Sequence, residues 1–258
     1  MPLALADVIR WMPYMLCVLV RVSALLASLP APFGTGSPMQ VRGGLAVLIS
    51  IALAAGLVPQ AAPIPLDPVA IVSAAVGELA IGAVIGLAAR ATIASAEVAG
   101  NAVGLSIGQG FAGSIDPSFG EQALPTGRIA SSLGALIFFA MQGHHVALRA
   151  LRESLAQAPP GHALGGVMHE GVFRVGAELI GTGLRIASPV VASMLLVQVG
   201  LALVSRAAPR VQIFALSFAV TSSVGLVILY AAAPSMTLAI EQSIAGLPEA
   251  LGQALGAP

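Results

Sequence analysis

The longest apolar run of the chain is VAIVSAAVGELAIGAVIGLAARATIASAEVAGNAVGLSIG at 69–108, which contains three charged residues and no proline. A helix that crosses a bilayer needs roughly 20 mostly apolar residues. The run has 40 residues, and the next proline is Pro117. It therefore predicts one long helix, or two helices joined end to end, in a lipid environment.

Apolar regions recur on both sides of this run, at 11–29, 43–58, 129–151, 172–205 and 211–240. The first two end in LPAPFGTGSP (29–38) and PQAAPIPLDP (59–68), where prolines and glycines stop a helix. The short turn SRAAPR (205–210) separates the last two, so we expect a helical hairpin there. About six hydrophobic segments predict an all-α, polytopic membrane protein of long helical hairpins.

Composition excludes several other classes of protein. Apolar residues make up 57% of 258 residues and charged residues 9%, whereas a soluble domain carries about 25% charged residues. Net charge is zero, which argues against a strongly basic surface for nucleic acid. Cys17 is the only cysteine, so an intrachain disulfide or thiolate metal site is excluded. We expect a single membrane-associated domain over residues 1–258.

Six charged residues lie within or close to the apolar regions: Arg21, Glu78, Arg90, Glu97, Glu178 and Arg185. A charge at the centre of a lipid-facing helix costs about 2.5–3.5 kcal/mol. Arg90 and Glu97 are seven positions apart, so they share a helix face but cannot bond directly in a straight helix. Four alternatives remain for these intramembrane or interface charges: partners on neighbouring helices of this chain or another, a watery lumen, the headgroup interface, or a proton relay.

Small residues recur every four positions at Ala96, Gly100, Gly104 and Gly108. Such stripes mark helix faces that pack closely in a bilayer, so we expect helix-packing positions at Ala96, Gly100 and Gly104. Gly82 and Gly86 repeat the spacing upstream, but the 29 glycines of the chain explain that repeat equally well.

The stripe leads into GQGFAGSIDPSFGEQALPTG at 108–127, whose glycines and prolines no regular helix accommodates. Irregular backbone is tolerated at membrane depth only where it is buried in protein or lines an aqueous cavity. The segment is therefore either an ordinary surface loop or a feature of a lumen.

Signals of catalysis are weak. Adjacent His144 and His145 point about 100° apart on a helix, so we expect packing or capping and no metal site. No HExxH-type spacing joins histidines to carboxylates, and no convincing internal repeat suggests a secondary transporter. We expect no enzyme and no cofactor.

Three stretches together carry a resemblance to a known family: GLSIGQGFAGSIDPSFGEQ at 104–122, GHH at 143–145 and ASPVVASMLLVQVGLALVSRAAPRVQIFALSF at 187–218. In this order they resemble the FliR family of flagellar biosynthetic proteins over nearly the whole chain. The hairpin also resembles the related injectisome component of virulence secretion, whereas the GHH and GQGFAG stretches look more flagellar.

The resemblance implies a subunit of the export gate of the flagellar type III secretion apparatus, a conduit for unfolded flagellar proteins. In that family one copy joins five P-type and four Q-type subunits in a helical hetero-oligomer, contacted by a B-type subunit. The implied location is the bacterial inner membrane within the flagellar basal body, raised toward the periplasm. Membrane lipid is the other implied contact.

The resemblance also implies a loop that plugs the closed pore. Carried onto this sequence, the plug consists of Gly108, Gly110, Phe111, Ala112, Gly113, Ser114, Ile115, Asp116 and Pro117. Phe111 and Ile115 would supply bulk, and Gly110 and Gly113 would let the loop swing aside. Asp116 is equally well explained as a turn former with no gating role. The hairpin turn falls at Arg206, Pro209 and Arg210.

Overall fold

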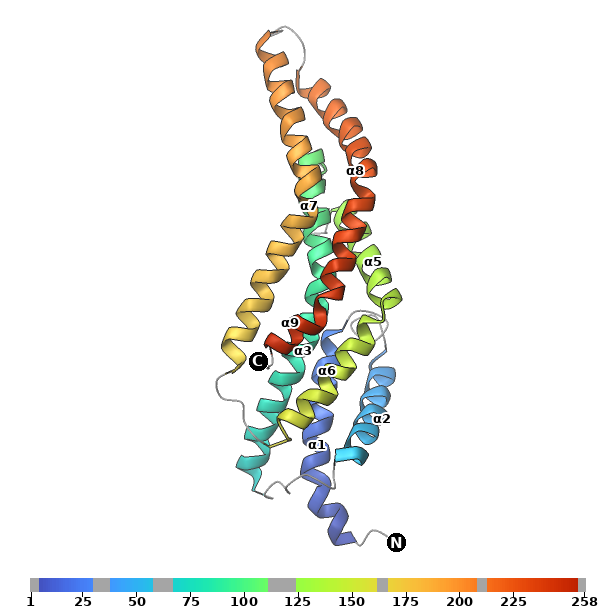
Figure 1. The fold of residues 1–258 in the computed structure, drawn as a ribbon, viewed down its shortest axis with the longest axis vertical. Helices are drawn as coiled ribbons and strands as arrows, with labels where there is room; N and C mark the ends of the chain where they lie inside the picture. The colour runs from blue at the N-terminus through green and yellow to red at the C-terminus, as the bar shows by residue number, and fades with distance from the viewer. Residues whose placement is uncertain are drawn as a thin grey trace. The chain divides into compact units, whose positions relative to one another are not determined.

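The computed structural model describes residues 5–29, 38–57, 67–110, 124–161, 167–207 and 213–254 (Figure 1). Over these ranges the chain forms α1 (Leu5–Ser28), α2 (Met39–Leu57), α3 (Pro68–Ile107), α5 (Pro125–Ala140), α6 (Gly143–Gln157), α7 (Val167–Ala207), α8 (Ile213–Ala245) and α9 (Leu247–Ala254). No strand occurs in the described part of the chain. The prediction of an all-α protein is confirmed.

The run at 69–108 forms one continuous helix, α3, and not two. Asp67 begins it: its Oδ2 accepts a hydrogen bond from the backbone N–H of Ala70 at 3.2 Å, which satisfies a free donor of the first turn. Gly108 ends it with a φ of 94°, in the left-handed region. Two hydrogen bonds close this end, from Gly108 N to Leu105 O and from Gln109 N to Gly104 O, the pattern of a Schellman cap.

Helices of membrane length are confirmed as well. Four described helical segments are long and apolar enough to cross a bilayer: Trp11–Ser28, Pro68–Ile107, Ala177–Ala207 and Ser217–Gly252. The apolar part of α2, Met39–Ala54, is shorter. The chain is therefore a polytopic membrane protein by helix length and composition.

One expected region differs from the prediction. Residues 129–151 do not form a single segment, because the chain turns between α5 and α6 at Met141 and Gln142. Gln142 has a φ of 58°, which a right-handed helix does not permit. Beyond it α6 is amphipathic, with Arg149 and Glu153 on its exposed side. Neither α5 nor α6 reaches the roughly 20 residues of a membrane crossing.

The chain divides into two compact units. Unit 1 comprises Met1–Ala91, Gln142–Gly176 and Gly246–Pro258, and unit 2 comprises Thr92–Met141 and Ala177–Ala245. In unit 1, α1 packs against α2 and α6 packs against α9. In unit 2, α5 contacts α8, and α7 and α8 run in opposite directions (Figure 1). The single domain over 1–258 stays a prediction.

Candidate functional site

Unit 1 contains a buried ion pair between α1 and α3. The Nε atom of Arg21 donates to Oε2 of Glu78 at 2.5 Å, and both side chains are almost completely removed from solvent, at 0% and 2% exposure. It is the one salt bridge among the residues that the structure describes. Two residues predicted as intramembrane charges thus neutralise each other across neighbouring helices.

The remaining polar atoms of this pair bond to the end of α6 and the turn that follows. Arg21 donates from Nη1 to Ser154 Oγ at 3.2 Å and from Nη2 to the carbonyl of Ala158 at 2.9 Å. The backbone N–H of Gly161 donates to the second oxygen of Glu78 at 3.2 Å. We call these five residues the Arg21 cluster; it joins α1, α3 and the end of α6.

Partnered charges of this kind are sensitive to the loss of one member. A buried pair contributes little net stability, because desolvation offsets the attraction, yet removing one partner destabilises a protein by about 3–5 kcal/mol. All three donor nitrogens of the Arg21 guanidinium have an acceptor in the cluster. The cluster therefore meets the condition under which a buried charge persists.

Glycines bring α3 against α1 on the same face as Glu78. A Cβ on Gly82 would collide with the carbonyl oxygen of Arg21, and one on Gly86 would lie 2.5 Å from Cβ of Ser28. Glu78, Gly82 and Gly86 are four positions apart, so they share one helix face. Composition alone was an adequate explanation of these glycines in the sequence, but the structure places both at a close helix contact.

In unit 2 the downstream stripe of α3 lies against α5. A Cβ on Gly100 would lie 2.5 Å from the carbonyl oxygen of Thr126, and one on Gly104 would collide with the Thr126 hydroxyl. On the α5 side, Gly134 lies where an added Cβ would be 3.0 Å from Cβ of Ala96. The three predicted helix-packing residues therefore all face one neighbouring helix.

The two ends of the glycine-rich segment are hydrogen-bonded to each other. Gln109 Oε1 accepts from Thr126 Oγ1 at 2.9 Å and from Thr126 N at 3.4 Å. About two turns earlier on α3, Asn101 Oδ1 accepts from the backbone N–H of Leu124 at 3.2 Å. Of the predicted plug, Gly108 forms the helix cap and Gly110 is exposed. The other predicted plug residues lie outside the described ranges: Phe111, Ala112, Gly113, Ser114, Ile115, Asp116 and Pro117.

The other predicted charges have different surroundings. Arg90, Glu178 and Arg185 are exposed, and within the described ranges none of them forms a salt bridge. Glu97 is half-buried, and its Oε2 accepts from Ser131 Oγ on α5 at 3.4 Å. Arg206 is exposed near the end of α7, while its predicted turn partners Pro209 and Arg210 are outside the described residues.

The adjacent histidines lie at the start of α6, with ring centroids 4.2 Å apart. Burial lowers the pKa of His144, and the neighbouring His145 lowers this pKa further. Among the described residues no group of three or more His, Cys, Asp or Glu side chains is arranged to hold a metal ion.

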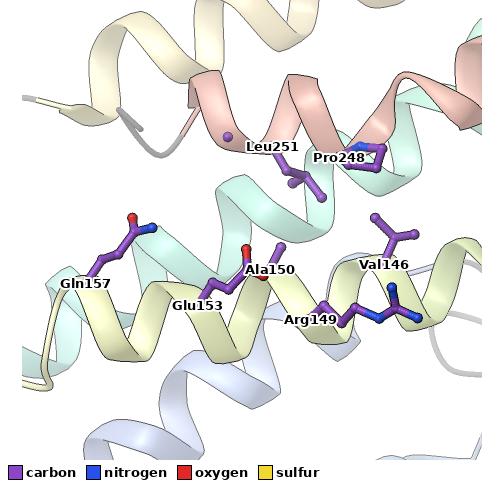
Figure 2. Close-up of a pocket in the computed structure, with 8 residues that line it drawn as sticks. Val146, Arg149, Ala150, Glu153, Gln157, Pro248 and Leu251 are labelled. Carbon is purple, nitrogen blue, oxygen red and sulfur yellow. The ribbon is translucent and has the colours of Figure 1, made fainter. Parts of the chain in front are cut away.

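Each unit contains pockets at the seams between its own helices. A pocket of about 210 Å³ in unit 1 follows the seam between α6 and α9. Figure 2 shows Arg149, Glu153 and Gln157 along α6, with Leu251 and Pro248 facing them from α9. A larger and mainly apolar pocket of about 360 Å³ in unit 2 is lined by residues of α3, α5 and α8. Its apolar lining suits a hydrocarbon group and offers no set of groups for acid–base chemistry.

Sequence reasoning missed the α6 side of the Arg21 cluster. Ser154 is an ordinary serine in the sequence, and the carbonyl of Ala158 and the N–H of Gly161 are backbone groups with no sequence signature. The available signals were the isolated Arg21 and Glu78, and the four-residue spacing from Glu78 to the two glycines that follow it. The bond between Gln109 and Thr126 was missed as well, because both residues lie in the glycine- and proline-rich stretch 108–127 and nothing in that stretch marks them as partners.

Comparison with known proteins gives the family. The sequence matches the bacterial export proteins, family 1, over residues 12–247. It is 28% identical to flagellar biosynthetic protein FliR of Escherichia coli (strain K12) over 227 residues, which is 88% of this chain and 86% of the relative. It is 28% identical to FliR of Pectobacterium carotovorum subsp. carotovorum over 86% of this chain and 85% of the relative. Yop proteins translocation protein T of Yersinia pestis is 27% identical over 59% of each chain. This chain therefore belongs to the bacterial export proteins, family 1.

Proposed function

We propose that this chain is a subunit of the flagellar type III protein export gate and forms part of the conduit for unfolded flagellar proteins. The observation that carries the proposal is the family match over residues 12–247, with relatives named FliR aligned over 86% and 85% of their own length. Yop proteins translocation protein T aligns over only 59%, which favours the flagellar over the injectisome branch.

The chain would work inside a hetero-oligomer of five P-type, four Q-type and B-type subunits, in the inner membrane of the flagellar basal body and raised toward the periplasm. Its surface suits such surroundings. Large apolar side chains are exposed on the unit 2 helices, among them Leu196 at 75% and Val227 at 67%. Side chains of this kind are covered by lipid or by another protein chain in a functional membrane assembly.

We further propose that residues 108–117 plug the closed pore. A pore wide enough for an unfolded chain leaks ions unless an apolar constriction closes it. Two features support a plug whose ends are fixed to the neighbouring helices. The first is the Gly108 cap that ends α3, and the second is the pair of hydrogen bonds that Thr126 donates to Gln109 and Leu124 donates to Asn101. These bonds join the end of α3 to the start of α5 and would hold the base of the plug in place.

Purification tests the assignment. The full chain is produced with the P-, Q- and B-type subunits encoded in the same genome and extracted in mild detergent. An export-gate subunit co-purifies with them in one large assembly. A small homo-oligomer that forms in the presence of these subunits would contradict the proposal and favour a secondary transporter.

Ion leakage tests the plug. Deletion of residues 110–114 is introduced into the full chain, and assembly with the partner subunits is verified first. We expect the assembled deletion variant to make the membrane permeable to small solutes. A tight membrane with an intact assembly would leave the segment as a connector. Gly44→Ala on α2, where an added Cβ meets no atom within 4 Å, serves as the control variant outside the segment.

A further inference from the structure

We infer that the Arg21 cluster serves to attach the end of α6 to the α1–α3 pair, and that it is not needed for the packing of α1 against α3. This role is independent of the proposed export function. It concerns how unit 1 is assembled from segments that are far apart in the sequence: Arg21 and Ala158 are separated by 137 positions.

The contact between α1 and α3 is made without the charges. Gly82 and Gly86 let the backbone of α3 approach the carbonyls of Arg21 and Leu25 on α1. Close approach of this kind is the usual source of helix association in a bilayer, where the hydrophobic effect does not drive helices together. Cβ of Ala24 and Cβ of Ser28 on α1 also lie close to these two glycines, at 2.9 and 2.5 Å from the positions of added Cβ atoms.

The end of α6, by contrast, reaches α1 and α3 through polar bonds. The carbonyl of Ala158 lies just past the last residue of α6, where the helix carries unsatisfied carbonyls and a partial negative charge. The Arg21 guanidinium donates to this carbonyl and to Ser154 in the last turn. A cation at this position satisfies a carbonyl that no helical N–H can reach.

Glu78 holds the turn after α6 in the same way. One of its oxygens accepts from Arg21, and the other accepts from the N–H of Gly161. Gly161 has a φ of 95°, a conformation that glycine adopts at little cost. Each member of the pair thus bonds to a backbone group of opposite polarity: Arg21 donates to the Ala158 carbonyl, and Glu78 accepts from the Gly161 N–H.

The two members are also unequal. An arginine side chain stays charged in a protein, whereas a glutamate can become neutral by taking a proton. Loss of Glu78 therefore leaves a permanent buried cation, and loss of Arg21 leaves a group that can neutralise itself. We expect Glu78→Leu to disturb unit 1 more than Arg21→Met does.

Two cysteine reporters separate the two contacts. The only cysteine, Cys17, is fully buried on α1 one turn before Arg21, so it shares the helix face of Arg21 and serves as the reporter for the α1–α3 contact. Ala158→Cys in a Cys17→Ala background reports on the end of α6, where the native Ala158 side chain is 9% exposed. Labelling by N-ethylmaleimide is measured for the full chain in membranes, both with and without the partner subunits, and full labelling in SDS sets the scale.

The variants are Arg21→Met, Glu78→Leu and the double variant R21M/E78L, with Arg90→Met as the matched control. Arg90 is an exposed arginine on α3. In R21M/E78L we expect Cys17 to stay protected, while the reporter at position 158 labels about fivefold faster or more, as expected for the loss of one or two weak bonds. In Glu78→Leu we expect both reporters to label faster, and in Arg90→Met neither.

Two results would overturn the inference. Protection of position 158 in R21M/E78L would show that the cluster does not hold the end of α6. Rapid labelling of Cys17 in the same variant would show that the α1–α3 contact itself depends on the charges. Both readouts are separate from complex formation, so a failure of the export-gate assignment leaves them interpretable.

Discussion

The Gln109 side chain, just past the end of α3, accepts a hydrogen bond from the Thr126 hydroxyl, in the first turn of α5, at 2.9 Å. These residues bracket the segment 111–123 and hold its two ends together. Thr126 is buried, at 8% exposure, and its carbonyl lies against Gly100 on α3. The same residue therefore links the base of the proposed plug to the close packing of α3 and α5.

Thr126→Val keeps the shape of the side chain and removes the hydroxyl donor. We expect the substitution to lower the free energy of unfolding of unit 2 by about 0.5–1.5 kcal/mol, the net value of one hydrogen bond. Thermal unfolding in detergent measures the change. Ser132→Ala is the control, because Ser132 donates only to its own helix at an exposed position. Equal stability of the two variants would mean that the Gln109–Thr126 bond contributes nothing.

Gly100→Ala tests the close approach of α3 and α5. The added Cβ would lie 2.5 Å from the Thr126 carbonyl oxygen and 2.8 Å from Cα of Gly127, so backbone must move. We expect a loss of about 1–3 kcal/mol, the usual range for overpacking. Gly181→Ala on α7 meets nothing within 4 Å, and there alanine should stabilise the helix by about 0.5–1 kcal/mol. If the two substitutions changed stability in the same direction, the steric explanation would be wrong.

Gly108→Ala tests the helix cap before the proposed plug. At a φ of 94° an L side chain is strained, and we expect a loss of about 1–2 kcal/mol. Gly44→Ala on α2 serves as the comparison, because no atom lies within 4 Å of its added Cβ. Thermal unfolding of both variants is the measurement. Unchanged stability of Gly108→Ala would argue against the left-handed cap.

We expect the stability of unit 1 to depend on pH through His144. Burial and His145 lower the pKa of His144, so the folded state binds fewer protons than the unfolded state. Stability from this residue is complete above the unfolded pKa of about 6.5 and is lost as the pH falls toward the lowered folded value. Melting temperatures measured on both sides of this pH should fall on the acid side for the native chain.

In His144→Gln the melting temperature should fall less on the acid side than in the native chain. In His145→Gln, where the substituted side chain is exposed, the pH profile of the melting temperature should differ less from the native profile than that of His144→Gln does. An identical acid sensitivity in the native chain and His144→Gln would assign the effect to another group.

Helices could be predicted from the sequence where the apolar run was long. The stretch at 69–108 formed one helix, because it has no interior proline and its ends carry an Asp–Pro start and a glycine stop. The region 129–151 was misread, because hydropathy continued through Met141 while the backbone turned at Gln142. A left-handed residue that is not glycine leaves no reliable mark in composition.

The candidate site was only partly predictable. Arg21 and Glu78 stood out because lone charges in apolar helices must find partners. Their pairing with each other was not visible, since residues 57 positions apart share no local pattern. Arg90 and Arg185 looked equivalent to Arg21 in sequence, and burial alone distinguishes them.

The sequence alone determined that the chain lies in a lipid environment and that its secondary structure is helical. Long apolar runs must satisfy their backbone groups internally, so they form helices of membrane length whatever their neighbours. Tertiary structure alone decided which charges are buried together, which glycines touch a neighbouring backbone, and which carbonyl receives the Arg21 guanidinium. These relationships depend on distances between helices that local sequence does not encode, because a hydrogen bond or a Cβ contact changes within a few tenths of an ångström.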